Sequence, residues 1–407
     1  MISTRAKAWI LEPSLLVQAH FLCAKNPFDI KNNPDGYINF GTAENHLLWD
    51  LIEPKLKSFR PITESDTHYA ELYGSQAFRK DVASMLSDDW NKKISSDEIV
   101  IGSGASAILD LLAYALCGPG DGVLIPSPYY SGFDHDLKRA EAVSIPISID
   151  VNGDQALSVD LLKKTLQKCK SQKIRPRVLL LASPHNPLAR VFSNQELNEF
   201  LKVAVENGLD CIIDEIYAHS VFNGDFTSAR NLDESLQSKI HIVYGFAKDF
   251  SLCGYKTGIL HSYDKELIAV ARELAYFSPV STDTQKVLST LIHDRKWLLN
   301  LRIENALRLK KSFLIVSKEL QRLNIPIAPT HAGVFAWINL GAYLTEKTFK
   351  AENDLAESLF LNAKVNLTPG RVFNSSEPGW YRLCYAKSEA TIIEGIKRIE
   401  KVLTSLS

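Results

Sequence analysis

Short apolar runs alternate with amphipathic segments through the middle of this chain, and the alternation restricts the fold more than any other feature. The apolar runs begin at residues 99, 123, 178, 211 and 240. Segments with helical periodicity, such as residues 157–170 and 194–206, lie between these runs. Strands that alternate with helices form crossover units, and such units build a mostly parallel sheet. We therefore predict an α/β fold with one large sheet.

The chain after this alternation predicts a second, smaller lobe. A helical pattern extends over residues 283–323, and two segments of mixed or alternating polarity follow at residues 333–340 and 380–385. This mixture of helix and strand indicates an α+β unit. We expect an N-terminal arm and part of the small domain over residues 1–60, a large domain over residues 61–280, and the small domain over residues 281–407.

The composition narrows the class of protein. The chain has 407 residues, of which 45% are hydrophobic and 23% charged, and its formal net charge is -1. This balance argues against a nucleic-acid partner. The six cysteines form no Cys-x-x-Cys pair, so the sequence indicates neither a disulfide framework nor a zinc site. Because no apolar run is long enough to cross a bilayer and none reads as a secretory signal, we expect a cytoplasmic protein.

The residues that follow the apolar runs are the informative ones for function. In a parallel sheet the ligand lies beyond the carboxyl ends of the strands. Polar, aromatic or glycine residues follow five of the predicted strands, at residues 102–106, 126–130, 183–187, 214–217 and 245–248. We expect these segments to meet at one edge of the sheet and to form a binding site there.

Two lysines define the chemistry at the last of these strand ends. Lys248 follows the apolar run at residues 240–244, and Lys256 lies between Gly254 and Gly258. A lysine amine can form a Schiff base with an aldehyde, while a second cation offsets a phosphate on the same molecule. The alternative interpretation is a surface loop with two solvated lysines.

The other strand ends offer partners for the remaining parts of such a ligand. Ala105 and Ser106 open a helix after Gly104, and the amides of a helix start bind phosphate, although tight turns share this pattern. Asp214 ends an apolar strand, where a carboxylate needs a cation such as a protonated pyridine nitrogen. A helix cap or a salt bridge is the alternative for Asp214.

Aromatic and amide side chains complete the set. Tyr217 and Asn186 can hydrogen-bond the oxygen of a hydroxypyridine ring, and either Tyr130 or Tyr129 can stack on its face. Taken singly, each is as common in ordinary loops and cores. Together with a lysine at a strand end, they describe one ligand, pyridoxal phosphate.

With these strand-end residues, the chain resembles the fold type I pyridoxal-phosphate enzymes of the aspartate aminotransferase superfamily. Within that superfamily it is most similar to 1-aminocyclopropane-1-carboxylate synthase and synthase-like proteins. The matching segments are residues 33–36, 41–47, 125–133, 183–188, 214–217, 247–250, 254–258 and 377–382. The resemblance implies a large domain with a mostly parallel seven-stranded sheet, a smaller α+β domain, and a homodimer.

The resemblance also implies a role for each residue at the cofactor. Lys248 would form the Schiff base and later move the α proton, and Asp214 would contact the pyridine nitrogen. The phenolic oxygen would be contacted by Asn186 and Tyr217, the ring face by Tyr130, and the phosphate by Ala105, Ser106 and Lys256.

Two further residues are implied to bind the substrate. Arg382 resembles the family's carboxylate fork, because a planar guanidinium suits a bidentate grip on an α-carboxylate. An edge-strand salt bridge is the alternative for Arg382. The resemblance associates Glu44 with the sulfonium of S-adenosylmethionine, since an anion selects a fixed cation. The alternative for Glu44 is a carboxylate at a helix start.

Three departures from the family pattern affect these expectations. The superfamily usually has Ser-x-Ser-Lys and then an arginine between two glycines, where this chain has Gly245, Ala247, Lys248 and Lys256. Two hydroxyl donors are missing, and a lysine cannot grip a phosphate with two parallel N–H groups. We expect a phosphate site of altered geometry.

The third departure concerns a tyrosine that the synthases donate across their dimer. That tyrosine aligns here with Leu72, and Tyr73 is displaced by one position. A shift of one residue redirects a side chain completely. We therefore regard closure of a cyclopropane ring as the less favoured outcome.

The reaction implied is removal of the Cα proton from S-adenosylmethionine or a similar amino acid. Elimination or replacement at the γ carbon, with loss of methylthioadenosine, would follow, and in a replacement a second reactant captures the vinylglycine-type product. The alternatives are a class I/II aminotransferase and a carbon-sulfur lyase acting on a cysteine conjugate. A binding protein that has lost catalysis is an alternative from a different class.

Overall fold

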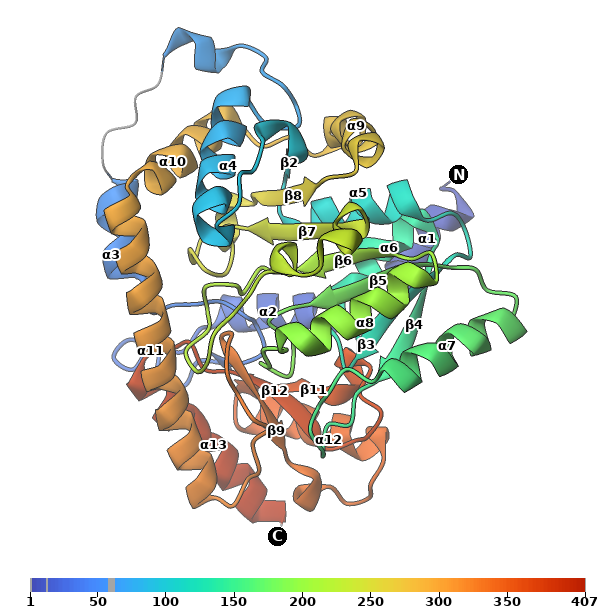
Figure 1. The fold of residues 1–407 in the computed structure, drawn as a ribbon. Helices are drawn as coiled ribbons and strands as arrows, with labels where there is room; N and C mark the ends of the chain where they lie inside the picture. The colour runs from blue at the N-terminus through green and yellow to red at the C-terminus, as the bar shows by residue number, and fades with distance from the viewer. Residues whose placement is uncertain (1, 12–13, 58–62, 407) are drawn as a thin grey trace.

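The computed structural model describes residues 2–11, 14–57 and 63–406, and it contains the predicted large sheet (Figure 1). Seven strands lie in the order β2-β8-β7-β6-β5-β3-β4. They are β2 (Ile99–Gly102), β3 (Gly122–Ser127), β4 (Val143–Ser148), β5 (Pro176–Ala182), β6 (Asp210–Asp214), β7 (Ile240–Gly245) and β8 (Gly258–Ser262). All neighbouring pairs are parallel except those of β8, which runs antiparallel to both β2 and β7. The prediction of a mostly parallel sheet in an α/β fold is confirmed.

Helices cover both faces of the sheet because successive side chains of a buried strand point to opposite faces. On β5, Val178 and Leu180 pack with the core beneath α5, α6 and α9, and Leu179 and Leu181 pack with the core beneath α4, α7, α8 and α10. The helices are α4 (Gln76–Trp90), α5 (Ala105–Leu116), α6 (Gly132–Leu137), α7 (Val159–Ser171), α8 (Asn194–Glu206), α9 (Lys265–Leu274) and α10 (Thr282–His293). The sheet is therefore the middle layer of three.

A smaller lobe packs below the carboxyl ends of these strands (Figure 1). Its strands β11 (Thr368–Pro369), β12 (Trp380–Cys384) and β9 (Phe335–Asn339) form an antiparallel sheet with β12 in the centre. The long helix α11 (Arg295–Arg322) runs beside both lobes. The remaining elements of this lobe are α12 (Phe349–Asn362), β10 (Val365–Asn366) and α13 (Glu389–Leu406).

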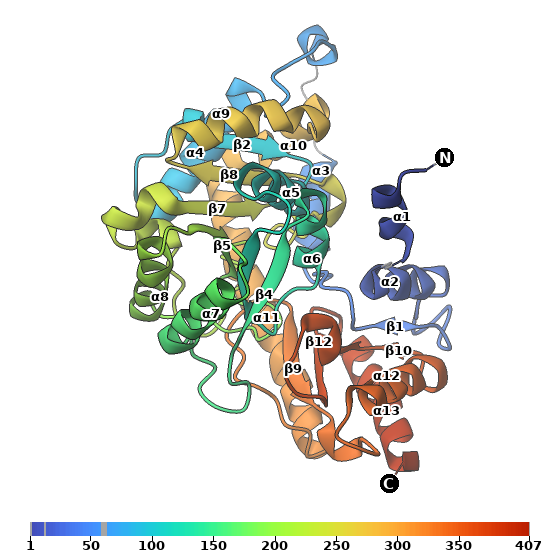
Figure 2. The same cartoon turned by 90° about the vertical axis from the view of Figure 1, so that its right-hand side faces the viewer.

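The N-terminal segment belongs with this smaller lobe. It contains α1 (Thr4–Leu11), α2 (Leu15–Lys25), β1 (Ile38–Asn39) and α3 (Trp49–Leu56). β1 pairs in parallel with β10, with Ile38 opposite Val365 (Figure 2). We keep the division into residues 1–60, 61–280 and 281–407 as a proposal, and its first boundary lies outside the described residues. Beyond the second boundary, α10 still contacts α4 of the large lobe, where His293 lies 2.6 Å from Asp81.

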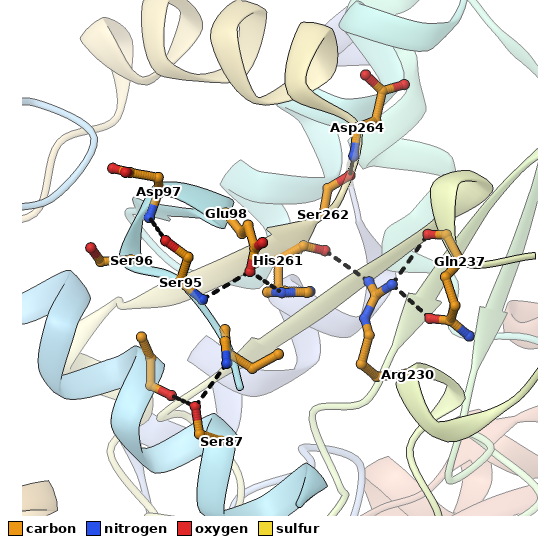
Figure 3. Close-up of polar contacts among 12 residues, drawn as sticks. Ser87, Ser95, Ser96, Asp97, Glu98, Arg230, Gln237, His261, Ser262 and Asp264 are labelled. Carbon is orange, nitrogen blue, oxygen red and sulfur yellow. Dashed lines mark hydrogen bonds and ion pairs between the residues drawn. The ribbon is translucent and has the colours of Figure 1, made fainter. Parts of the chain in front are cut away.

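Buried polar side chains gather near the C-terminal part of β8 (Figure 3). The guanidinium of Arg230 donates to the side chain of Gln237 at 2.8 Å and to the carbonyl of Ile240 at 2.9 Å. The buried imidazole of His261 lies 3.5 Å from Glu98. Burial lowers the pKa of His261 to about 4, so this ring is neutral at physiological pH.

The described residues contain no helix with both the length and the apolar character needed to cross a bilayer. Within the same residues, no group of three or more His, Cys, Asp or Glu side chains is placed to hold a metal ion.

Candidate active site

The ten residues singled out from the sequence all line one cavity of about 400 Å³ between the two lobes. They are Glu44, Ala105, Ser106, Tyr130, Asn186, Asp214, Tyr217, Lys248, Lys256 and Arg382. Most of them follow the carboxyl ends of β2, β3, β5, β6 and β7, because strands of one parallel sheet end at the same edge. The smaller lobe adds Glu44 and Arg382 from the opposite side.

Lys248 lies three residues beyond the end of β7, and its amine points toward the N-terminal segment. The Nζ atom donates a hydrogen bond to the carbonyl of Ala43 at 2.7 Å. Ala43 and the next residue, Glu44, both line the cavity. The amine is therefore held by a neutral carbonyl, and the residue after that carbonyl is Glu44, which also lines the cavity.

Asp214 is the last residue of β6, and its side chain is 6% exposed. Its carboxylate accepts a hydrogen bond from the amide of Ile216 at 3.2 Å, and within the described part of the chain it forms no ion pair. Burial raises the pKa of Asp214 to about 7, against a smaller lowering by the charge of Lys248. A buried carboxyl without a cation is costly, so the site fits a ligand that brings a protonated nitrogen.

The start of α5 and the side chain of Lys256 form an anion site. Gly104 caps the helix with a φ of 98°, which leaves the amides of Ala105 and Ser106 free of helical partners. The Nζ atom of Lys256 lies 3.5 Å from the position that a Cβ on Gly104 would occupy. A Cβ on Gly258 would come within 2.6 Å of the amide nitrogen of Ala105, so this glycine allows α5 to approach β8. Helix amides and one cation suit a phosphate.

The absence of a serine at residue 245 has a steric cause. A Cβ on Gly245 would lie 2.7 Å from the carbonyl oxygen of Thr257, the residue just before β8. Thr257 itself lines the cavity beside Lys256, and its hydroxyl donates to the carbonyl of Tyr255 at 3.1 Å. The cavity wall at Lys256 therefore includes a threonine that the sequence pattern did not indicate, and the altered phosphate site expected from Gly245, Ala247 and Lys256 stays a prediction.

Arg382 projects from the central strand β12 and is 2% exposed. Its guanidinium donates to the carbonyl of Gly41 at 2.7 Å and to Oδ1 of Asn186 at 3.0 Å, and it lies 4.6 Å from the ring of Phe373. Among the described residues it forms no ion pair, so the alternative of an edge-strand salt bridge is wrong. Its Nε–H remains without a protein partner. A guanidinium with unused donors in a cavity suits a carboxylate.

Glu44 is a fixed anion at the other end of the cavity. Its carboxylate lies 3.4 Å from the imidazole of His46, and this contact is the main reason that its pKa falls to about 2. The charges of Lys387 and His20 lower the pKa further. The alternative of a helix-start carboxylate is wrong, because α3 begins at Trp49 with Leu48 as its N-cap.

The structure also distinguishes between the two neighbouring tyrosines. Tyr130 lines the cavity, whereas Tyr129 is buried elsewhere and donates to Asp134 at 2.9 Å. Burial raises the pKa of Tyr130 to about 12 and that of Tyr217 well above its usual value. Both phenols are therefore protonated at neutral pH and able to donate hydrogen bonds.

Neither Leu72 nor Tyr73 lines the cavity of this chain. Two guanidinium groups contact the ring of Tyr73, those of Arg79 and Arg272, each 4.8 Å from its centre. This packing fixes the tyrosine in the large lobe and leaves it outside the described site.

Sequence reasoning missed one wall of the cavity. Helix α2 contributes Leu16, Val17, His20 and Phe21, and Nδ1 of His20 lies 3.0 Å from the hydroxyl of Thr42. Nothing in the order of these residues indicates a site, because their position depends on the pairing of β1 with β10.

Comparison with known proteins identifies the type of site. The sequence profile of the family described as aminotransferase class I and II matches residues 36–399. The chain belongs to this family. As a member, it is a pyridoxal-phosphate-dependent enzyme, and the fit is visible in the lysine amine, the unpaired Asp214 and the anion site at α5.

Curated relatives place this family member near one branch. It is 32% identical over 400 residues to 1-aminocyclopropane-1-carboxylate synthase 7 of Arabidopsis thaliana, covering 93% of this chain and 90% of the relative. It is 31% identical over 403 residues to the synthase CMA101 of Cucurbita maxima, covering 94% and 85%. The predicted similarity to the synthase branch is confirmed.

Solved structures agree on the fold. The aspartate aminotransferase of Thermus thermophilus with maleate has a TM-score of 0.83 at 19% identity, and 99% of each chain is covered. The aspartate aminotransferase of Rhizobium meliloti has a TM-score of 0.83 at 21% identity, with full coverage of both chains at 100%. At this identity the likeness concerns the fold alone.

Proposed function

We propose that this enzyme acts on S-adenosylmethionine or a similar amino acid, removes its Cα proton, and eliminates or replaces the γ substituent with loss of methylthioadenosine. The observation that carries the proposal is the ionised carboxylate of Glu44, one residue from the carbonyl that holds the Lys248 amine. An anion at this place selects a substrate whose side chain carries a positive charge. The similarity to the synthases supports the same choice.

Bound pyridoxal phosphate supplies the electron sink that makes the Cα proton removable. We assign Lys248 the roles of covalent attachment and of base at the Cα atom. Asp214 holds the ring nitrogen protonated, because its buried carboxylate needs that charge. Tyr217 and Asn186 would contact the ring oxygen, and Tyr130 would lie against the ring face, since all three line the cavity.

The phosphate is assigned to the N-terminus of α5 and to one cation. The amides of Ala105 and Ser106 and the Nζ atom of Lys256 face the same part of the cavity. A lysine contributes charge without the two parallel N–H groups of an arginine. The cofactor is therefore held by fewer directed hydrogen bonds than the usual family pattern provides.

Arg382 is assigned to the α-carboxylate of the substrate. Two of its five N–H groups are used by Gly41 and Asn186, and the rest are available for a carboxylate. The hydrogen bond from Arg382 to Asn186 joins the carboxylate site to the cofactor site. Substrate that binds Arg382 therefore also affects the position of Asn186, the residue assigned to the ring oxygen.

We favour capture by a second reactant over closure of a cyclopropane ring. Leu72 takes the position of the synthase tyrosine, and the ring of Tyr73 contacts the guanidinium groups of Arg79 and Arg272. The chain therefore lacks the phenol at the expected place. An aminotransferase remains the second candidate, because the family contains such enzymes and the same residues serve both reactions.

A homodimer and a cytoplasmic location are also part of this proposal. Large apolar side chains are exposed along the N-terminal helices, where Ile10 is 75% and Phe21 60% exposed. A second copy of the chain is the partner implied by the family resemblance, and light scattering during gel filtration measures the resulting mass.

Incubation of the purified holoenzyme with S-adenosylmethionine tests the proposed reaction. We expect methylthioadenosine in the mass spectrum with the wild type and none with Lys248→Ala. Release of pyruvate from a cysteine conjugate would identify a carbon-sulfur lyase, and conversion of the cofactor to its amine form by an amino acid would identify an aminotransferase. Absence of methylthioadenosine from the wild-type reaction at every pH would reject the proposal.

A further inference from the structure

A buried series of hydrogen bonds begins and ends at Lys248 and passes through helix α11. On the substrate side, the amine of Lys248 donates to Ala43 at 2.7 Å. Two residues further along the chain, Nδ2 of Asn45 donates to Oδ1 of Asn305 at 2.8 Å. Asn45 is 8% exposed and Asn305 is 0% exposed. The segment that carries Glu44 is thus fixed to α11 in the interior of the protein.

The same asparagine continues the series toward the lysine from the other side. Nδ2 of Asn305 donates to the carbonyl of His219 at 3.1 Å and lies 3.4 Å from the hydroxyl of Ser220. Ser220 donates to Oδ1 of Asp249 at 2.6 Å, and the amide of His219 donates to Oδ2 at 2.9 Å. Asp249 directly follows Lys248, so the backbone closes the ring.

The direction of each hydrogen bond is fixed by the chemistry of the groups. Oδ2 of Asp249 accepts from the amide of His219 and Oδ1 accepts from the hydroxyl of Ser220, which leaves the oxygen of Ser220 to accept from Asn305. The amide of Asn305 therefore faces Ser220 with its nitrogen, and its oxygen is left for Asn45. Oδ1 and Nδ2 of Asn305 therefore both form hydrogen bonds. No other side chain of the same size has one acceptor oxygen and two N–H donors.

Burial makes this arrangement stiff. Ser220 is 0% and Asp249 2% exposed, so water does not replace a broken bond. An unsatisfied buried polar group is costly, which penalises any displacement of one segment without the other. The segment with Glu44 and the segment with Lys248 therefore move together. Movement of one segment alone would break buried hydrogen bonds.

We propose that Asn305 is a positioning residue that couples the substrate-binding segment at residues 43–45 to the position of the Lys248 amine. When an amino acid draws Glu44 toward its side chain, the displacement reaches Lys248 through Asn45, Asn305, Ser220 and Asp249. This inference rests on the proposed role of Lys248 as the lysine that carries the cofactor. It adds a residue outside the cavity to the machinery of the site.

The test is a double-mutant cycle in the holoenzyme with Asn45→Ala, which removes the donor to Oδ1 of Asn305, and Asn305→Asp, which keeps that acceptor and removes both donors to His219 and Ser220. The readouts are the absorption of the lysine-bound cofactor and the dissociation constant of S-adenosylmethionine measured through it. We expect each single variant to weaken binding roughly tenfold, which corresponds to about 1.4 kcal/mol. The double variant should bind about as weakly as either single variant, because one break already uncouples the segments.

Asn305→Asp and Asn305→Leu test the central residue itself. Asn305→Leu removes the acceptor and the donors together, so it should bind as weakly as the double variant. Ser220→Ala leaves the bond from Asn305 to the carbonyl of His219 and should have a smaller effect. Ser312→Ala is the matched control, because Ser312 is a buried polar residue two turns further along α11 and contacts the carbonyl of Lys387. We expect Ser312→Ala to leave absorption and binding unchanged.

The outcomes separate this inference from the proposed function. Independent effects, in which the double variant binds roughly a hundredfold more weakly, would overturn the coupling. Wild-type binding by folded Asn305→Asp would overturn it as well. A wild-type protein that develops no cofactor absorption would instead overturn the proposed role of Lys248, and the coupling with it.

Discussion

Full or partial burial is the property that makes Asp214 and Lys248 suited to bind a cofactor. Asp214 and Lys248 are of types that are usually solvated, yet among the described residues Asp214 is buried without an ion pair and the lysine amine is hydrogen-bonded to the carbonyl of Ala43. Each group lacks a complementary charge or a reaction partner within the described protein. Pyridoxal phosphate brings a protonated nitrogen for one and an aldehyde for the other.

Asp214→Asn should stabilise the protein without cofactor and impair the protein with it. The pKa of Asp214 is raised to about 7, so the folded state holds a proton that the unfolded state releases between pH 4 and 7. The stability from this group is present at low pH and is lost as the pH rises through 7. At pH 8 and without cofactor, we expect the free energy of unfolding of Asp214→Asn to exceed that of the wild type by roughly 1–4 kcal/mol, as measured by urea denaturation.

The same substitution at low pH is the control for this prediction. Below pH 4 the two proteins should be of similar stability, because the carboxyl is neutral in both states. With the cofactor bound, the variant should remove the Cα proton far more slowly. Equal stability of the two apoproteins at pH 8 would contradict the buried, unpaired carboxyl.

Some site residues follow from the sequence and others do not. The cavity collects Asp214, Asn186 and Lys248 because they follow strands of one parallel sheet, and a rule about strand ends predicts such residues. Asn305 and Phe21 follow no such rule. Their relation to the site depends on packing between segments far apart in the chain, and local patterns contain no information about it.

At the scale of elements, the contact between β7 and β8 sets the shape of the phosphate site. Gly245 faces Gly258 across the two strands, and both lack the space for a side chain. This close approach brings Lys256 and Thr257 to the N-terminus of α5. The loss of the family's serine is therefore a property of the strand pair.

Gly245→Ala should destabilise this strand pair. The added Cβ would lie 2.7 Å from the carbonyl oxygen of Thr257, so the strands must separate or bend. We expect a loss of about 1–3 kcal/mol in the free energy of unfolding, together with weaker retention of the cofactor. Chemical denaturation and equilibrium dialysis measure the two effects.

Gly254→Ala is the matched control, because a Cβ there meets nothing within 4 Å. It should change stability by less than about 0.5 kcal/mol. Wild-type stability of Gly245→Ala would show that the two strands are further apart than described.

His261 on β8 predicts a dependence of stability on acid. Its pKa is lowered to about 4 by burial, below the value near 6.5 of an exposed histidine. Between these two pH values the histidine is protonated in the unfolded state and neutral in the folded state. The free energy of unfolding therefore falls as the pH is lowered from 6.5 toward 4. His261→Phe keeps the ring contacts with Trp90 and Tyr263 and should make this fall smaller by roughly 1–3 kcal/mol.

Thermal unfolding of both proteins at several pH values checks this prediction. The difference between wild type and variant isolates His261 from the carboxylates that titrate in the same range. A constant difference from pH 7 to pH 4 would show that the ring is accessible to protons.

Strands could be predicted from the sequence where both of their faces are buried, because such strands consist mostly of apolar residues. The buried strands β5, β6 and β7 appear in the sequence as apolar runs, because both of their faces are covered. The edge strand β4 was missed, since most of its side chains are partly or fully exposed and it has no such run. Edge position, which depends on the whole sheet, decides whether a strand has a recognisable pattern.

At the scale of the whole molecule, the site exists because two lobes meet. Arg382 and Glu44 come from the smaller lobe, and the remaining predicted residues come from the large one. The pairing of β1 with β10 brings the N-terminal segment to residues more than three hundred positions away. The sequence predicts two lobes, but neither periodicity nor composition predicts which segments pair across such a separation.

The central claim is that Lys248 is the amine that carries pyridoxal phosphate. Reduction of the holoenzyme with borohydride fixes the cofactor to its lysine, and mass spectrometry of the resulting peptides locates it. We predict a pyridoxyl group on Lys248 alone. A pyridoxyl group on Lys256, or on no lysine of a protein supplied with the cofactor, would contradict the account.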